Sequence, residues 1–207
     1  MSRPLTPSQT IGPFFHRALL HEGWDDLAAR GAAGERIVIE GRVLDGDGAP
    51  VSDAMIETWQ ANAAGRYDHP EDYQESDRQE THRREKPLDS NFHGFGRTAT
   101  GPDGSFRLRT IKPGSVRSVR PVPGGGDATQ APHINLSIFA RGLLKRLVTR
   151  IYFPVEPLNG ADPLLSTLPA SRRATLIARA GRAGAAERVL HFDIVLQGDN
   201  ETVFLDV

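Results

Sequence analysis

The sequence has no cysteine among its 207 residues. This absence excludes disulfide bonds, zinc–thiolate sites, iron–sulfur clusters and a thiol nucleophile. An excess of charge of one sign is also lacking, because 25 basic residues balance 26 acidic ones to a formal net charge of −1. The composition therefore gives no indication of binding to nucleic acid or to an anionic membrane surface.

Long apolar runs are missing as well. No stretch approaches the roughly 20 apolar residues of a membrane span. Residues 1–7 (MSRPLTP) show no apolar run after their charge, so we expect no secretory signal. The length suits one domain with one core. We expect a soluble, cytoplasmic protein whose residues 1–207 form a single domain.

The most informative stretch present is residues 131–141 (APHINLSIFAR), which alternates like a strand with one buried face. One parity is apolar: Ile134, Leu136, Ile138 and Ala140. The other parity carries the polar side chains and one aromatic: His133, Asn135, Ser137, Phe139 and Arg141. The second face is typical of the wall of a pocket or of a subunit contact, not of a core.

The start of this strand resembles half of a metal clamp. A His-x-His pair on a strand places two imidazoles side by side, where they can hold a metal. Here Asn135 follows His133 at that spacing, and an amide is a weak, neutral ligand for a transition metal. From the spacing alone, His133 is either a remnant of a ligand pair or an ordinary hydrogen-bonded histidine.

Short strands separated by turn residues make up most of the remaining pattern. Two short helices are predicted, at residues 24–30 and 169–178, and residues 114–130 are predicted as a loop. The further predicted strands are residues 35–44, 51–60, 92–100, 105–111, 145–153, 189–197 and 202–207. These elements indicate an all-β fold, an antiparallel β-sandwich with a few short helices.

Two segments stand apart from the sandwich. Residues 1–16 contain three prolines and end in an aromatic pair, which indicates an extended N-terminal arm that docks on another surface. Residues 71–86 hold ten charges in sixteen positions with both signs mixed. Such a run is typical of a solvated loop, and we interpret it as a charged surface insertion.

Four motifs, in order along the chain, together carry a resemblance to a known family. They are residues 8–14 (SQTIGPF), 57–67 (ETWQANAAGRY), 110–114 (TIKPG) and 131–135 (APHIN). The chain resembles the intradiol ring-cleaving dioxygenases, and the match continues to residues 198–204. Each motif alone is weak, whereas the ordered set is specific.

The resemblance implies a ferric site with two tyrosines and two histidines in the catalytic chains of the family. Tyr67 stands at the first tyrosine position and His133 at the first histidine position. Residues 115–120 (SVRSVR) offer no second tyrosine, and Asn135 replaces the second histidine. One tyrosinate at most cannot offset the charge of Fe(III). We therefore expect no iron and no catalytic residue in this chain, with Tyr67, His133 and Asn135 as vestigial ligand positions.

That loss resembles the iron-free alpha-type chains of two-subunit members. The resemblance implies a homologous beta chain that holds Fe(III), in an alpha–beta hetero-oligomer that cleaves protocatechuate with O2 to 3-carboxy-cis,cis-muconate in the beta-ketoadipate pathway of aromatic catabolism. Thr10, Gly12, Pro13 and Arg141 match residues that contribute to the partner's substrate site. Arg141 is either a contact for the anionic substrate or a plain interface ion pair.

Two other functions stay open from the sequence. The chain is alternatively a binding or assembly module that kept the sandwich and lost catalysis. It is alternatively an independent metalloenzyme that uses Tyr67, His133 and a further ligand such as His69 or His93.

Overall fold

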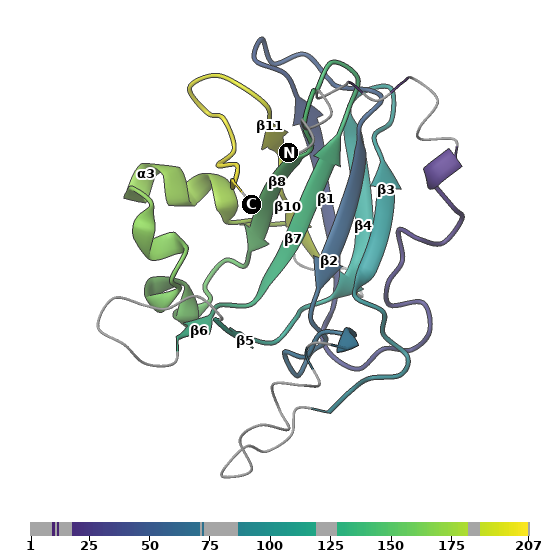
Figure 1. The fold of residues 1–207 in the computed structure, drawn as a ribbon, viewed down its shortest axis with the longest axis vertical. Coiled ribbons are helices and arrows are strands. Elements are labelled where there is room, and N and C mark those ends of the chain that lie inside the picture. The colour runs from purple at the N-terminus through teal and green to yellow at the C-terminus, as the bar shows by residue number, and fades with distance from the viewer. Residues whose placement is uncertain are drawn as a thin grey trace, which may run out of the picture.

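The computed structural model describes residues 10, 12, 18–70, 72, 87–118, 128–181 and 187–206. Two main sheets pack face to face, which confirms the predicted β-sandwich (Figure 1). One sheet contains β11 (Ile194–Val195), β1 (Arg36–Leu44), β10 (Arg188–His191), β9 (Arg179–Ala180) and β4 (Ser105–Ile111). The other has the order β3 (Phe95–Ala99), β2 (Met55–Gln60), β7 (His133–Phe139) and β8 (Leu147–Tyr152).

The four-stranded sheet is antiparallel throughout, whereas β1 pairs in parallel with β10 and β11. The core lies between the two sheets, because alternate residues of each strand point inward. On β7 the predicted apolar parity is confirmed, with Ile134, Leu136 and Ile138 at most 1% exposed. The polar parity of β7 therefore faces outward from the sandwich.

The short helical segments gather beside β8, on the outer side of the four-stranded sheet (Figure 1). A second apolar cluster of Ala131, Tyr152, Leu165 and Leu176 holds them there. The segments are η1 (Pro157–Ala161), η2 (Leu165–Thr167), α3 (Ala170–Arg173) and η3 (Ala174–Leu176). No helix among the described residues has the length and apolar character needed to cross a bilayer.

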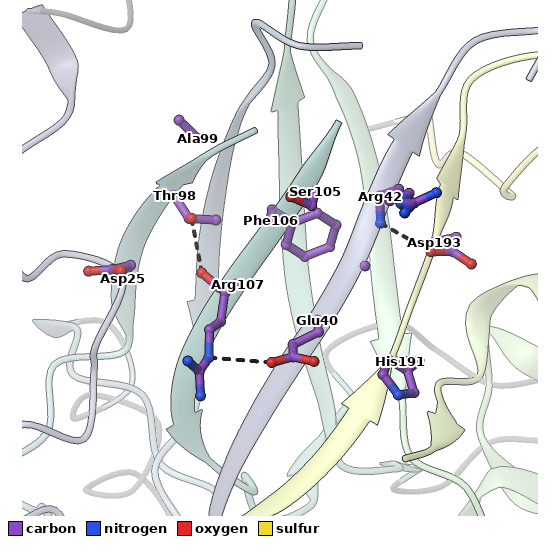
Figure 2. Close-up of a pocket in the computed structure, with 11 residues that line it drawn as sticks. Asp25, Glu40, Arg42, Thr98, Ala99, Ser105, Phe106, Arg107, His191 and Asp193 are labelled. Atoms are coloured by element: carbon purple, nitrogen blue, oxygen red, sulfur yellow. Dashed lines mark hydrogen bonds and ion pairs between the residues drawn. The ribbon is translucent and has the colours of Figure 1, made fainter. Parts of the chain in front are cut away.

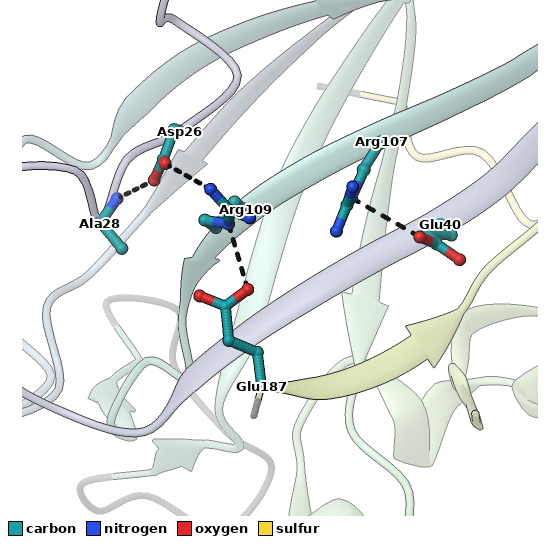
Figure 3. Close-up of polar contacts among 6 residues, drawn as sticks. All are labelled: Asp26, Ala28, Glu40, Arg107, Arg109 and Glu187. Atoms are coloured by element: carbon teal, nitrogen blue, oxygen red, sulfur yellow. Dashed lines mark hydrogen bonds and ion pairs between the residues drawn. The ribbon is translucent and has the colours of Figure 1, made fainter. Parts of the chain in front are cut away.

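Several predicted elements differ from the structure. Residues 24–30 form turns, because their backbone bonds to β4: Leu27 N–H donates to the Arg109 carbonyl, and Arg109 N–H donates to the Asp25 carbonyl. Arg109 adds ion pairs to Asp26 and Glu187 (Figure 3). The predicted loop 114–130 contains two short paired strands, β5 (Val116–Arg117) and β6 (Thr129–Gln130).

The predicted C-terminal strands are also interrupted. Residues 189–197 divide into β10 and β11, because the Asp193 carboxylate takes the Arg42 N–H and breaks the backbone ladder. No strand forms over residues 202–206, whose N–H groups donate to three different elements instead of one neighbour. The predicted helix 169–178 begins after Pro169 as expected, but ends at Leu176.

Candidate functional site

Tyr67 lies at the end of a loop that two of the sequence motifs build together. The Asn62 side chain accepts hydrogen bonds from the N–H groups of Ala64 and Arg66, at 3.0 Å each. Gly114, from the second motif, donates its N–H to the Asn62 carbonyl at 2.9 Å. A Cβ at Gly114 would lie 2.5 Å from the Ala63 carbonyl oxygen, so only glycine fits this approach. The two motifs therefore fix the loop that carries Tyr67.

Both the ring and the backbone of Tyr67 are held in place. The ring stacks on Trp59 of β2 with ring centroids 5.7 Å apart, and the backbone N–H donates to the Asp72 carboxylate at 2.8 Å. Its hydroxyl accepts a hydrogen bond of 3.3 Å from the Asn135 side-chain amide. Burial raises the pKa of Tyr67, although the Asn135 hydrogen bond and the charge of Arg150 oppose this rise. The phenol is therefore protonated at neutral pH.

His133 is buried at the start of β7, with 3% of the residue exposed. Its Nδ1–H donates to the Ala131 carbonyl at 2.8 Å, which leaves Nε2 as the bare nitrogen of the neutral ring. Among the described residues Nε2 has no hydrogen-bond partner. Burial, with the charge of Arg150, lowers the pKa of His133 to about 4. This is the tautomer that a metal-binding histidine uses.

Arg150 on β8 is the residue that sequence reasoning missed. It pairs directly across the ladder with Asn135, and its Nε donates to Asn135 Oδ1 at 3.0 Å. Its Nη1 donates to Gln130 Oε1 at 2.7 Å and to the Tyr152 hydroxyl at 3.3 Å. Register could have found it, because Arg150 and Asn135 share the outward face, but strand pairing cannot be read from one strand alone.

The polar chain continues to a buried carboxylate. The Tyr152 hydroxyl donates to Asp162 Oδ1 at 3.1 Å, and Asp162 also accepts the N–H groups of Ala131, Leu164 and Leu165. Asp162 is completely buried. One connected network therefore runs from Tyr67 through Asn135, Arg150 and Tyr152 to Asp162.

Comparisons with known proteins agree with this fold. The profile of a dioxygenase family, described as "Dioxygenase", matches residues 12–198. The protocatechuate 3,4-dioxygenase alpha chain of Burkholderia cepacia is 39% identical over 214 residues, covering 98% of this chain and 97% of that one. The chain belongs to the intradiol dioxygenase family.

Two further relatives place the chain within the family. The protocatechuate 3,4-dioxygenase beta chain of Burkholderia cepacia is 41% identical over 172 residues, covering 82% of this chain and 67% of that one. The structure of a dioxygenase domain from Streptomyces sp. SirexAA-E has a TM-score of 0.55 and 28% identity, covering 81% of this chain and 83% of that one. The chain is thus similar to both subunit types of one dioxygenase.

The non-haem iron of intradiol dioxygenases does not fit the donors that this chain offers. Tyr67, His133 and Asn135 supply one phenol, one imidazole nitrogen and one amide, and the amide is hydrogen-bonded to the Arg150 guanidinium. A fixed positive charge beside the ligand positions repels a trivalent cation. No group of three or more His, Asp or Glu side chains capable of holding a metal occurs within the described ranges.

Two of the residues predicted to contribute to the partner's substrate site, Thr10 and Arg141, lie at the far end of β7. The strand ends at Phe139, two residues earlier than predicted, because Gly142 takes a positive φ of 85° in the following turn. Arg141 lies in this turn and pairs through Nε with the Asp53 carboxylate. Thr10 Oγ1 of the arm accepts the Gly142 N–H at 2.8 Å.

The structure therefore brings Thr10 and Arg141 into one corner. The Arg141 side chain is 60% exposed there, and the Asp53 side chain is 19% exposed. Gly12 is also exposed, whereas Pro13 lies outside the described residues. This corner and His133 are separated by the length of β7, about 20 Å at the usual rise per residue. The ligand positions and the corner are two separate places.

The structure also shows a cavity of about 600 Å³ away from both places (Figure 2). It lies against the five-stranded sheet, and neither Arg141 nor any vestigial ligand position lines it. Most of its charged side chains are paired within the chain, as Glu40 is with Arg107 (Figures 2 and 3). The lining offers no ligand-directed cluster beyond these pairs.

The remaining candidate ligands are engaged or lie in loops. His93 Nδ1 contacts the Asp68 carboxylate at 2.8 Å and is more than half exposed. His69 is exposed in the loop that follows Tyr67. The charged run 71–86 lies outside the described residues apart from Asp72, as does most of the arm 1–16.

Proposed function

We infer that this chain is the iron-free, alpha-type subunit of a cytoplasmic protocatechuate 3,4-dioxygenase. It pairs with a homologous beta chain that holds Fe(III), and the pair cleaves protocatechuate with O2 between the two hydroxylated carbons. Support comes from the near full-length similarity to an alpha chain and from the substituted ligand set. The observation that carries the proposal is the hydrogen bond from the Arg150 guanidinium to Asn135. It places a cation beside the chain's own expected ligand positions.

The corner of Thr10 and Arg141 forms this chain's contribution to the partner's substrate site. Protocatechuate carries a carboxylate, and a guanidinium binds a carboxylate through two parallel hydrogen bonds. Asp53 holds the Arg141 side chain, and Thr10 holds the turn next to it. Gly12 and Pro13 are expected from the sequence to contribute to the same substrate site. Arg141 thus orients the substrate while the metal in the beta chain supplies the electrophilic activation of the ring.

The direct experiment compares this chain, its beta partner and their mixture for O2 uptake with protocatechuate. We expect activity only where the beta chain is present, and full activity only in the complex. Arg141→Ala in the complex raises KM for protocatechuate about tenfold, the size of one lost charged hydrogen bond. Arg188→Ala is the matched control, because Arg188 is an ion-paired arginine of the other sheet.

Two results would contradict the proposal. Unchanged KM and kcat for Arg141→Ala would remove the substrate contact and favour a pure assembly module. Catechol cleavage by this chain alone would favour the independent metalloenzyme.

A further inference from the structure

A guanidinium stands among the vestigial ligand positions. The Arg150 side chain donates to Asn135 Oδ1 at 3.0 Å. Asn135 is the residue that takes the place of the second histidine. The same Asn135 amide donates to the Tyr67 hydroxyl at 3.3 Å and to the Trp59 carbonyl at 3.2 Å. One cation therefore connects, through one amide, to the remaining phenol.

The Arg150 guanidinium contacts three of the side chains around it. It donates to Asn135 Oδ1 at 3.0 Å and to Gln130 Oε1 at 2.7 Å. It also contacts Tyr152, whose ring centroid is 5.8 Å from that of His133. A positive charge at this position does the electrostatic work that a bound cation does in a ligand set of this kind.

We propose that Arg150 is an internal cation that takes the place of the metal ion among Tyr67, His133 and Asn135 and prevents these side chains from binding iron. The inference rests on the proposed function only for the identity of the ligand positions. His133 is not the obstacle, because its buried Nε2 is bare and its ring is fixed through Nδ1. The obstacle is the Arg150 guanidinium, which is hydrogen-bonded to the Asn135 amide and repels a second cation.

The proposal makes iron binding depend on two changes together. Asn135→His alone restores a donor but leaves Arg150 in place, and Arg150→Gln alone removes the charge but adds no donor. The double variant Asn135→His/Arg150→Gln offers two imidazoles and one phenol without the internal cation. The matched control is Asn135→His/Arg150→Lys, which keeps the positive charge.

The experiment adds ferric iron to the purified full chain and measures bound iron and the visible tyrosinate-to-iron absorption band. We expect no bound iron and no band in the wild type, in either single variant or in the lysine control. The double variant still has a single tyrosinate, so we expect partial occupancy by ferric iron, with more bound iron and a stronger band than in the wild type and in all the other variants. Iron bound by Asn135→His with Arg150 in place, or no gain in the double variant, overturns the inference. Iron bound by the wild type, in which Arg150 is also in place, overturns both the inference and the proposed function.

Thermal unfolding gives a second readout that does not need the double variant to fold. Arg150→Gln loses the contacts of Arg150 with Gln130 and Tyr152 and is expected to lower the Tm by about 4 °C or more. Arg150→Lys, which keeps the charge, is expected to lower it less. An unchanged Tm in Arg150→Gln means that the guanidinium does not hold the pocket, and the inference fails.

Discussion

Arg141 depends on Asp53 for its direction. An exposed arginine has many rotamers, and a partner carboxylate that is mostly covered limits them. Thr10 accepts the N–H of the next residue, Gly142, so the arm holds the turn while Asp53 holds the guanidinium. Asp53 was not singled out by the sequence, because nothing in a turn between two strands indicates its partner 88 positions away.

We predict that Asp53→Ala raises KM for protocatechuate about threefold in the complex while kcat changes little. The loss of orientation outweighs the small gain in positive charge, because charges at exposed positions are screened. Asp53→Glu restores most of the affinity. Steady-state kinetics of the complex checks this, with Asp103→Ala as control at an exposed carboxylate in the turn before β4. Equal KM values in Asp53→Ala and wild type would show that Asp53 has no positioning role.

His133 gives the chain a pH-dependent stability. Its pKa of about 4 in the folded chain is below the value of about 6.5 in the unfolded chain. The unfolded chain therefore binds more protons between these values, so this contribution is complete above about pH 6.5 and is lost as the pH falls toward 4.

We predict that His133 accounts for a loss of about 2 kcal/mol in the free energy of unfolding between pH 7 and pH 5. Urea unfolding of the wild type and of His133→Asn at both pH values measures it. Asparagine keeps a donor near the Ala131 carbonyl but does not titrate. The variant is therefore expected to have a lower free energy of unfolding at pH 7 than the wild type, and to lose less of it between pH 7 and pH 5. A variant as sensitive to pH as the wild type would contradict the assignment.

At the scale of elements, the loop of residues 61–67 and the segment that follows β4 act as one unit. Gln60 donates to the Ile111 carbonyl at 3.0 Å and accepts from the Thr110 hydroxyl at 2.8 Å, and all three residues are buried. Gly114 then packs against the loop itself. Tyr67 is positioned by this contact between two segments.

We predict that Gly114→Ala lowers the free energy of unfolding by about 2–3 kcal/mol, because its Cβ would meet backbone atoms that cannot move separately. Gly160→Ala is the matched control, since no heavy atom outside its chain neighbours lies within 4 Å of the added Cβ. We expect Gly160→Ala to change the free energy of unfolding by no more than about 0.5 kcal/mol. Denaturant unfolding of both variants checks this, and equal stabilities would mean that the loop adapts without cost.

The sequence predicted elements well where one physical rule acted alone. Alternation placed β7 and its buried face, and glycine turns bounded β4. It failed where tertiary contacts decided, as in residues 24–30, whose backbone pairs with β4 instead of forming a helix. The ligand positions inferred from the motifs stay a prediction, whereas Arg150 and Asp53 could not be found from the sequence, because their contacts depend on register and on a distant turn.

At the scale of the whole molecule, β7 connects two places with different tasks. Its start carries Asn135, which pairs with Arg150, and the turn after it carries Arg141 with an exposed side chain. In the proposed function the first end of the strand holds no metal, and the other end contributes to the partner's substrate site. The two-chain assembly is then the functional unit.

The most direct measurement is the iron content of the purified two-chain complex with and without changes at the ligand positions of this chain. We predict one iron per alpha–beta pair in the wild type, and the same value after Tyr67→Phe and after His133→Asn in this chain. Two irons per pair, or iron lost when Tyr67 or His133 is changed, would contradict the account.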